Sequence, residues 1–446
     1  MSAEAQSLQP PRSTTERILS VFTEIRAGEG ASTLAFTLNI FLILTAYYLI
    51  KPVREALILS VPGGPEIKSY AATGQALLLL FAVPAYGWLA SHVRRVPLID
   101  SVTVFFAACL VVFYLLIGAG VSVAIAFFLW VGIFNLMLPA QLWAFANDVY
   151  RPEAGRRLFV LIAFGASAGA VSGSLLANQI IKYVGVYQML LVAAGLLLAT
   201  LVLTHYINRR EQPGTHAAAT TAQPDEPLEP GNAFGFVFRN RYLLLIALML
   251  MFNNWVNSNG EYILGRIVRG AADAAAALPG GERHDTFIAK FYSSYFGVVN
   301  LVGLLLQLLV VSRIVKYIGV PAAICILPAI TLGSYATIVA MPVLGVVRWV
   351  KTIENSTDYS LQSTVKQMLY LPTTRTEKYK AKQAIDSFFV RAGDVCSSGL
   401  VLAGTTALAF GVQQFALVTC ILSAIWLVLA AAVGKRLRAL TRVQAD

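Results

Sequence analysis

The run "ASTLAFTLNIFLILTAYYLIKPVREALILS" (Ala31–Ser60) begins with twenty uncharged residues and then places Lys51, Arg54 and Glu55 where an apolar segment would continue. About twenty apolar residues in a helix span the hydrocarbon core of a bilayer. The run therefore predicts a membrane helix that carries charges near one end. Because a charge at the bilayer centre costs about 3 kcal/mol, each of the three needs a partner or a water-filled cavity.

The composition of the whole chain agrees with a membrane protein. Its 446 residues are 57% hydrophobic and 13% charged, and the mean hydropathy is +0.68. Such a chain has too little charge to cover a water-soluble domain. The net charge of +11 is explained by basic loops on one side of the membrane, which argues against a nucleic-acid polymer as a partner.

Reading apolar runs at about 20 residues per crossing predicts an all-α membrane protein with twelve transmembrane helices. Most of the 34 basic residues then lie in loops on one side, so the positive-inside rule places both termini in the cytoplasm. We expect a multi-pass protein of the inner (cell) membrane. The expected spans are 32–60, 67–91, 96–118, 121–147, 157–181, 185–207, 240–264, 285–311, 318–340, 342–371, 384–410 and 412–433.

A long polar interruption divides the spans into two sets of six. It is rich in Pro, Ala and Thr and is typical of a flexible linker. A Tyr-x-Pro follows the fourth span of each set, at Tyr150 and at Tyr370. Repeated six-helix halves around a cavity predict a major facilitator-like architecture. The expected domains are a cytoplasmic N-terminal segment (1–30), a first half (31–207), a cytoplasmic linker (208–239), a second half (240–434) and a cytoplasmic tail (435–446).

The tenth span carries a polar stripe at helical spacing, steps of about 3 and 4 residues. Because one helix face collects these positions, we expect it to face an aqueous pathway. Glu354, next to the stripe, could pair with Lys351 or Arg348. The seventh span adds asparagines and Glu261 on one face, suited either to a polar solute or to contacts between helices. The polar stripe consists of Arg348, Lys351, Asn355, Asp358, Gln362 and Lys366.

The balance of these intramembrane charges is modestly cationic, which suits an anion bearing phosphate or carboxylate. The sequence has no GxxxxGK[ST] loop, no Ser/His/Asp constellation and no CxxC spacing. We therefore expect neither an ATP-hydrolysing pump nor an enzyme, and neither a metal site nor a cofactor. Asn147 and Asp148 close the fourth span, where a plain helix-end role and a site role remain open.

Several of the same segments resemble the bacterial and plastid nucleotide transporter family of ATP:ADP antiporters. The resemblance implies that Arg54 stands at the position of an essential lysine, that Asp148 and Glu261 occupy acidic positions of the family, and that Lys366 is the lysine of its KxMxYxP run. Arg for Lys is not neutral at a phosphate site. The segments are "YYLIKPVREALILS", "LWAFANDVYRPEAGRRLFVLIAFGASAG", "NSNGEYILGR" and "KQMLYLPTTRTEKYKAKQAIDSFFVRAG".

The preferred hypothesis is a transporter that exchanges nucleotides, or similar phosphorylated anions, by alternating access and functions as a monomer. One alternative is a proton-coupled facilitator for another organic anion, with Glu55 or Glu261 as the titrating group. Another is a non-transporting sensor that retains the fold. The residues expected at the substrate site are Lys51, Arg54, Glu55, Asp148, Asn257, Glu261, Arg348, Lys351, Glu354, Asp358 and Lys366.

Overall fold

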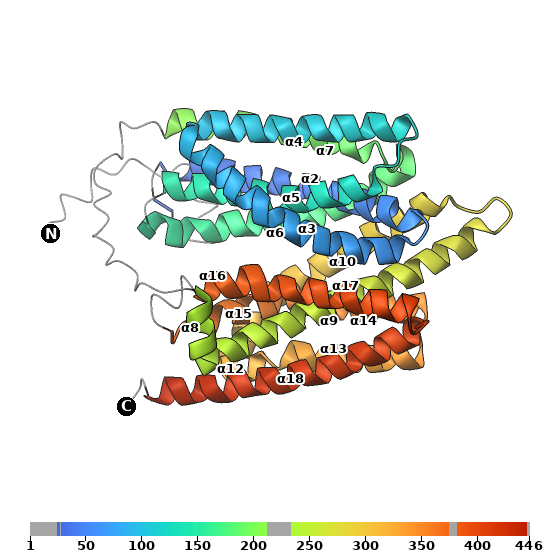
Figure 1. The fold of residues 1–446 in the computed structure, drawn as a ribbon. Helices are drawn as coiled ribbons and strands as arrows, with labels where there is room; N and C mark the ends of the chain where they lie inside the picture. Colours follow the sequence, from blue (N-terminus) through green and yellow to red (C-terminus); the bar gives the residue numbers. More distant parts are fainter. Residues whose placement is uncertain (1–24, 27, 151, 212–232, 374–380, 444–446) are drawn as a thin grey trace. The chain divides into compact units, whose positions relative to one another are not determined.

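The computed structural model describes residues 25–443 apart from 27, 151, 212–232 and 374–380 (Figure 1). The secondary structure of the described residues is helical, and the predicted all-α class is confirmed. Three of the expected segments are covered only in part: 1–30, 208–239 and 435–446. Their remaining residues lie outside the described part of the chain, as do 374–380 in the basic loop after the tenth span.

The first six expected spans each coincide with one long apolar helix. Each of these helices has the length and hydropathy needed to cross a membrane. Their ends lie within a few residues of the expected ones because Gly, Pro and charged residues interrupt the apolar runs there. The helices are α2 (Gly30–Ser60), α3 (Gly64–His92), α4 (Arg95–Gly118), α5 (Ala124–Val149), α6 (Pro152–Tyr183) and α7 (Met189–Arg210).

The later spans are more broken. Among the described residues, nine helical segments are long and apolar enough to cross a membrane; the seventh, tenth and eleventh expected spans are not among them. These three carry charges and amides, and the last two contain π-helices. The elements are α8 (Ala233–Arg239), α9 (Arg241–Ala276), α10 (His284–Leu309), α11 (Val311–Tyr317), α12 (Val320–Ala323), α13 (Ile326–Ala340), α14 (Leu344–Thr357), η2 (Asp358–Gln362), α15 (Ser363–Met368), α16 (Lys382–Ala384), η4 (Ile385–Phe389), α17 (Val390–Thr406) and α18 (Val412–Val443).

Two helix ends differ clearly from expectation. Helix α9 continues to Ala276 and α18 to Val443, each well beyond the predicted end of its span at 264 and at 433. The extensions are rich in Ala, Leu and Arg, which have high helix propensity and continue a helix once it has begun. The end of an apolar run therefore predicts where the membrane-spanning part ends. It does not predict where the helix itself ends.

The helices pack into two compact units. The first comprises residues 1–54 and 79–221, and the second comprises 55–78 and 222–446. In the first, α4 lies beside α7 (Figure 1). In the second, α9 packs against α17 and α18, and α18 also packs against α13. The end of α2 and the first half of α3 thus pack with the helices of the second unit.

A glycine seam joins α2 to α6 in the first unit. Gly165, Gly169 and Gly173 follow one another at four-residue spacing on α6, and a Cβ at any of them would lie within 3 Å of a carbonyl oxygen of α2. The Thr45 hydroxyl donates a hydrogen bond across the seam to the Gly169 carbonyl, at 3.3 Å. Small residues at this spacing let membrane helices approach backbone to backbone.

Candidate functional site

The charged residues at the end of α2 lie against different surroundings. Lys51 is buried, and its Nζ lies 5.8 Å and 5.2 Å from the ring centroids of Tyr47 and Tyr48. The Arg54 guanidinium lies 4.9 Å from the Phe128 ring of α5. A cation over an aromatic face is stabilised electrostatically, and more strongly when both are removed from water. Aromatic rings of the first unit therefore hold both cations.

Glu55, one residue beyond Arg54, packs in the second unit. Its side chain is fully buried, and Oε2 lies 2.7 Å from Lys68 Nζ of α3. The same lysine lies 3.4 Å from Glu261 Oε2 of α9 and 5.5 Å from the Tyr292 ring. Lys68 thus bridges two carboxylates that the sequence analysis assigned to the site. The sequence analysis did not include Lys68 in the site, although its place at the start of the expected span 67–91 is a signal for a charge within the membrane.

A hydrogen-bonded chain continues from Glu261 into α14. Asn355 donates from Nδ2 to Glu261 Oε1 at 3.3 Å and to the Tyr295 hydroxyl at 2.8 Å. The Tyr295 hydroxyl in turn donates to the Lys351 carbonyl at 3.3 Å. Helices α3, α9, α10 and α14 are therefore connected through polar groups, most of which are buried.

The Lys351 and Glu354 side chains form an ion pair in the interior of the second unit. Lys351 Nζ lies 2.7 Å from Glu354 Oε1, and the Tyr335 hydroxyl donates to the same oxygen at 3.3 Å. The predicted pairing of Glu354 with Lys351 is confirmed. A Cβ at Gly260 would collide with the Tyr335 hydroxyl and lie 2.6 Å from Lys351 Nζ. Glycine at this position makes the space that the pair occupies.

The polar stripe differs from the predicted continuous α-helical face. Its centre is buried, with Lys351 fully enclosed. The π-helix η2 begins at Asp358, and a π turn inserts one extra residue, so residues beyond it are displaced around the helix axis. Lys366 lies 3.3 Å from Asp386 Oδ1 of η4. At the other end, Arg348 donates to the Ser294 hydroxyl at 3.3 Å.

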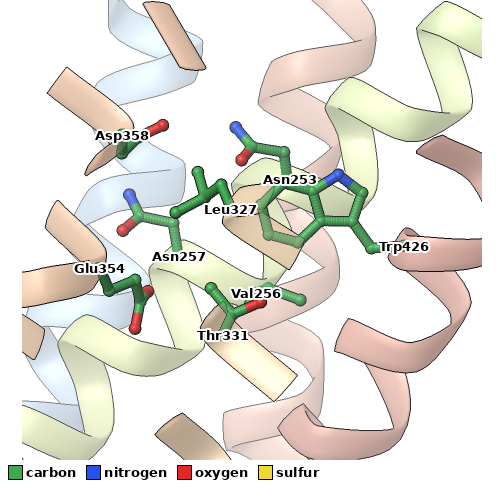
Figure 2. Close-up of a pocket in the computed structure, with 8 residues that line it drawn as sticks. All are labelled: Asn253, Val256, Asn257, Leu327, Thr331, Glu354, Asp358 and Trp426. Atoms are coloured by element: carbon green, nitrogen blue, oxygen red, sulfur yellow. The ribbon is translucent and has the colours of Figure 1, made fainter. Parts of the chain in front are cut away.

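A small pocket lies within the second unit, between α9, α13, α14 and α18 (Figure 2). Its volume is about 10 Å³, close to the smallest cavity that holds one water molecule. Asn257 and Asp358 of the predicted site face it together with Glu354. The pocket is therefore narrow, and both polar and apolar side chains line it. Its lining residues are Asn253, Val256, Asn257, Leu327, Thr331, Glu354, Asp358 and Trp426.

Asp148 belongs to the first unit. It is exposed in the last turn of α5, with Oδ2 3.7 Å from Arg95 Nη1. Arg95 opens α4 and also lies 4.9 Å from the Phe145 ring. This arrangement is a helix-end ion pair that connects α5 to the start of α4. An exposed pair of this kind contributes little to stability.

Comparisons with known proteins identify the family. A family model described as "TLC ATP/ADP transporter" matches residues 124–437, which is more than half of the chain. The chain belongs to the TLC ATP/ADP transporter family. The TLC match includes Asp148, Glu261 and Lys366, whereas Lys51 and Arg54 precede it.

The relatives of this TLC chain are distant. It is 22% identical over 295 residues to "ADP,ATP carrier protein 1" of Chlamydia muridarum, covering 58% of this chain and 54% of the carrier. It is 25% identical over 322 residues to "ADP,ATP carrier protein 5" of Rickettsia bellii, covering 61% and 59%. The chain thus spans little more than half the length of the curated relatives that it matches.

Solved structures support the fold of the TLC chain. An auto-inhibited POT family peptide transporter has a TM-score of 0.63 at 10% identity and covers 91% of this chain and 96% of its own. The nucleoside transporter NupG has a TM-score of 0.60 at 13% identity and covers 92% and 99%. At sequence identities this low, the similarity supports a shared fold and nothing about function. The chain is a multi-pass membrane protein with an all-helical, major facilitator-type fold, as predicted.

Proposed function

We propose that this protein exchanges nucleotides, ATP and ADP or similar phosphorylated anions, across the cell membrane by alternating access. The single observation that carries the proposal is the match to the ATP/ADP transporter model over 124–437. Both termini lie in the cytoplasm, and one chain forms the complete pathway. The gradient of one nucleotide drives the movement of the other.

In this proposal the cations of the predicted site bind the phosphates. Arg54 binds phosphate oxygens through its planar guanidinium and Lys51 binds as a point charge, while the rings of Tyr47 and Tyr48 offer a face to the base. Lys366 and Arg348 bind phosphate at other stages of the cycle, when Lys366 exchanges Asp386 for the substrate. Glu55, Glu261 and Asp148 hold cations in place when no substrate is bound.

The direct test is exchange in proteoliposomes that contain the purified protein. Labelled ATP outside should enter vesicles loaded with ADP and should not enter vesicles loaded with buffer. The Lys366→Gln variant should lose most of this uptake. Lys316→Gln, which removes an exposed lysine of α11, is the matched control and should retain it.

The two alternatives give other outcomes in the same vesicles. Uptake of an organic anion that follows an imposed proton gradient, without need for internal nucleotide, would identify a proton-coupled facilitator. A protein that stays monodisperse yet moves none of the nucleotides or organic anions offered would favour the non-transporting sensor.

A further inference from the structure

A close contact between α9 and α17 brings polar side chains of the two helices together. A Cβ at Gly393 would lie within 3 Å of main-chain atoms of α9. Beside this contact, Asn254 Nδ2 donates a hydrogen bond to the Val390 carbonyl at 2.8 Å. One turn further along both helices, the Ser258 hydroxyl donates to Asp394 Oδ1 at 2.7 Å. These contacts fix the position of the Asp394 carboxylate, which is buried.

The Asp394 carboxylate binds an arginine that is more exposed than itself. Arg391 Nη1 donates to Asp394 Oδ2 at 3.3 Å. The Arg391 side chain is 39% exposed, whereas the Asp394 side chain is 9% exposed. Among the described residues, the guanidinium has no other hydrogen-bond partner. Because a guanidinium carries five N–H donors, Arg391 has donors available for a ligand.

The place of Arg391 in the expected span 384–410 indicates what these donors face. The residue lies about two turns inside the span, where a charge needs water or a partner. An arginine in contact with lipid extends its side chain toward the headgroups. Arg391 instead donates to Asp394, one turn further into α17. Its exposed donors therefore suit a water-filled part of the transport pathway.

Two other cations of the second unit are less accessible to a solute. Lys351 is 0% exposed and Lys68 is 7% exposed. Each has a carboxylate partner at 2.7 Å, Glu354 for Lys351 and Glu55 for Lys68. Arg391 therefore offers a solute more exposed donors than either lysine does.

We infer that Arg391, which lies outside the set expected at the substrate site, binds phosphate oxygens of the substrate. Asp394 is the carboxylate that positions its guanidinium. The inference rests on the proposed function, because it takes a phosphorylated anion as the substrate. A guanidinium binds a phosphate through two parallel hydrogen bonds, and one contact to Asp394 leaves enough donors for such a pair.

The first experiment tests whether Arg391 faces water, and it needs no nucleotide. Arg391→Cys and the matched control Val395→Cys are reconstituted into liposomes and treated with a membrane-impermeant anionic methanethiosulfonate on both sides. Val395 lies one turn further along α17, is 49% exposed and suits contact with lipid. The cysteine introduced at 391 should react at least about tenfold faster than the one at 395, because the thiolate reacts and apolar surroundings keep a thiol protonated.

Peptide mass spectrometry separates the introduced cysteine from the four native ones. Equal reaction rates at the two positions would overturn the inference, because Arg391 would then have no more contact with water than Val395 has.

The second experiment tests whether Arg391 binds the substrate. Nucleotide-induced thermal stabilisation of the purified protein gives its affinities for ATP and ADP. Arg391→Gln should weaken both affinities about tenfold or more, since it removes hydrogen bonds to a charged group. Arg391→Lys keeps the charge without the paired hydrogen bonds. It should weaken the affinities less, and it provides the test if Arg391→Gln fails to fold.

A matched control and the possible outcomes separate this inference from the proposed function. Arg436→Gln removes an exposed arginine of α18 and should leave both affinities unchanged. If nucleotides stabilise Arg391→Gln with the same affinity as the wild-type protein, the inference fails and the proposed function stands. If neither ATP nor ADP stabilises the wild-type protein, the proposed function fails, and the ligand inferred for Arg391 fails with it.

Discussion

Helix α5 and the segment α14–η2–α15 occupy corresponding places in the sequence, since each precedes a Tyr-x-Pro, but their interiors differ. Helix α5 buries Phe127, Phe134 and Phe145 and a single polar side chain, Gln141. The later segment buries a lysine, a glutamate, an asparagine and a glutamine and includes a π-helix. The fourth span of the first set thus has an apolar interior, whereas the corresponding span of the second set buries charged and amide side chains.

The largest effect is expected from breaking the buried ion pair between Lys351 and Glu354 in α14. Lys351→Met leaves Glu354 as a buried charge without its ammonium partner, which should destabilise the protein by about 3–5 kcal/mol. The measurement is thermal unfolding of the purified variant. Adding Glu354→Gln to the first change should restore most of the stability. If Lys351→Met alone is as stable as the wild-type protein, Lys351 and Glu354 do not form a buried ion pair.

The second prediction concerns the cations of α2, which lie against aromatic rings. If Arg54 binds phosphate, Arg54→Gln should weaken nucleotide affinity by about ten- to a hundredfold, since a charged hydrogen bond contributes about 1.5–3 kcal/mol. Nucleotide-induced thermal stabilisation measures the change, with Lys316→Gln as the control. An unchanged affinity would remove Arg54 from the substrate site and leave the ring contact as its role.

The third prediction tests the space around the buried pair. Gly260→Ala would bring a Cβ against Tyr335 and Lys351, and overpacking of this kind costs about 1–3 kcal/mol. Gly333→Ala on α13 adds the same methyl group where no atom lies within 4 Å, and should be neutral or slightly stabilising. Equal unfolding temperatures for the two variants would contradict the close packing at Gly260.

The smallest effect is expected in α5. Both amide atoms of Gln141 are buried without a hydrogen-bond partner among the described residues. Gln141→Leu fills a similar volume without the unsatisfied polar atoms, so it should stabilise the protein by about 1 kcal/mol. A loss of transport with this variant would instead give α5 a polar role and would weaken the contrast with α14.

The sequence predicts the membrane helices because their signal is local. Twenty consecutive apolar residues leave the backbone few alternatives in a bilayer. The pairing of Lys351 with Glu354 is also local, since the two residues lie three positions apart on one helix. The stretch from Lys51 to Glu55 predicts charges that need partners, but it does not predict which partners. Arg54 and Glu55 belong to different units, and their partners come from α5 and α3.

Other features depend on contacts distant in sequence. The pocket combines α9, α13, α14 and α18, and no pattern within one of them specifies the others. The role of Lys68 depends on carboxylates from α2 and α9. The π-helix at Asp358 does not follow from residue spacing, and it separates Lys366 from the face that the spacing predicts. The roles of the site residues in transport stay predictions until the exchange assay is done.

The glycine seam between α2 and α6 also determines how this chain can vary. Positions 165, 169 and 173 admit no side chain, because the main chain of α2 already fills the place of a Cβ. Val160 and Phe164, which helical spacing places on the other face of α6, are exposed and can exchange with other apolar residues. Substitution in α6 should therefore be permissive on one face and forbidden at every fourth residue on the other, a pattern that a saturation library would display directly.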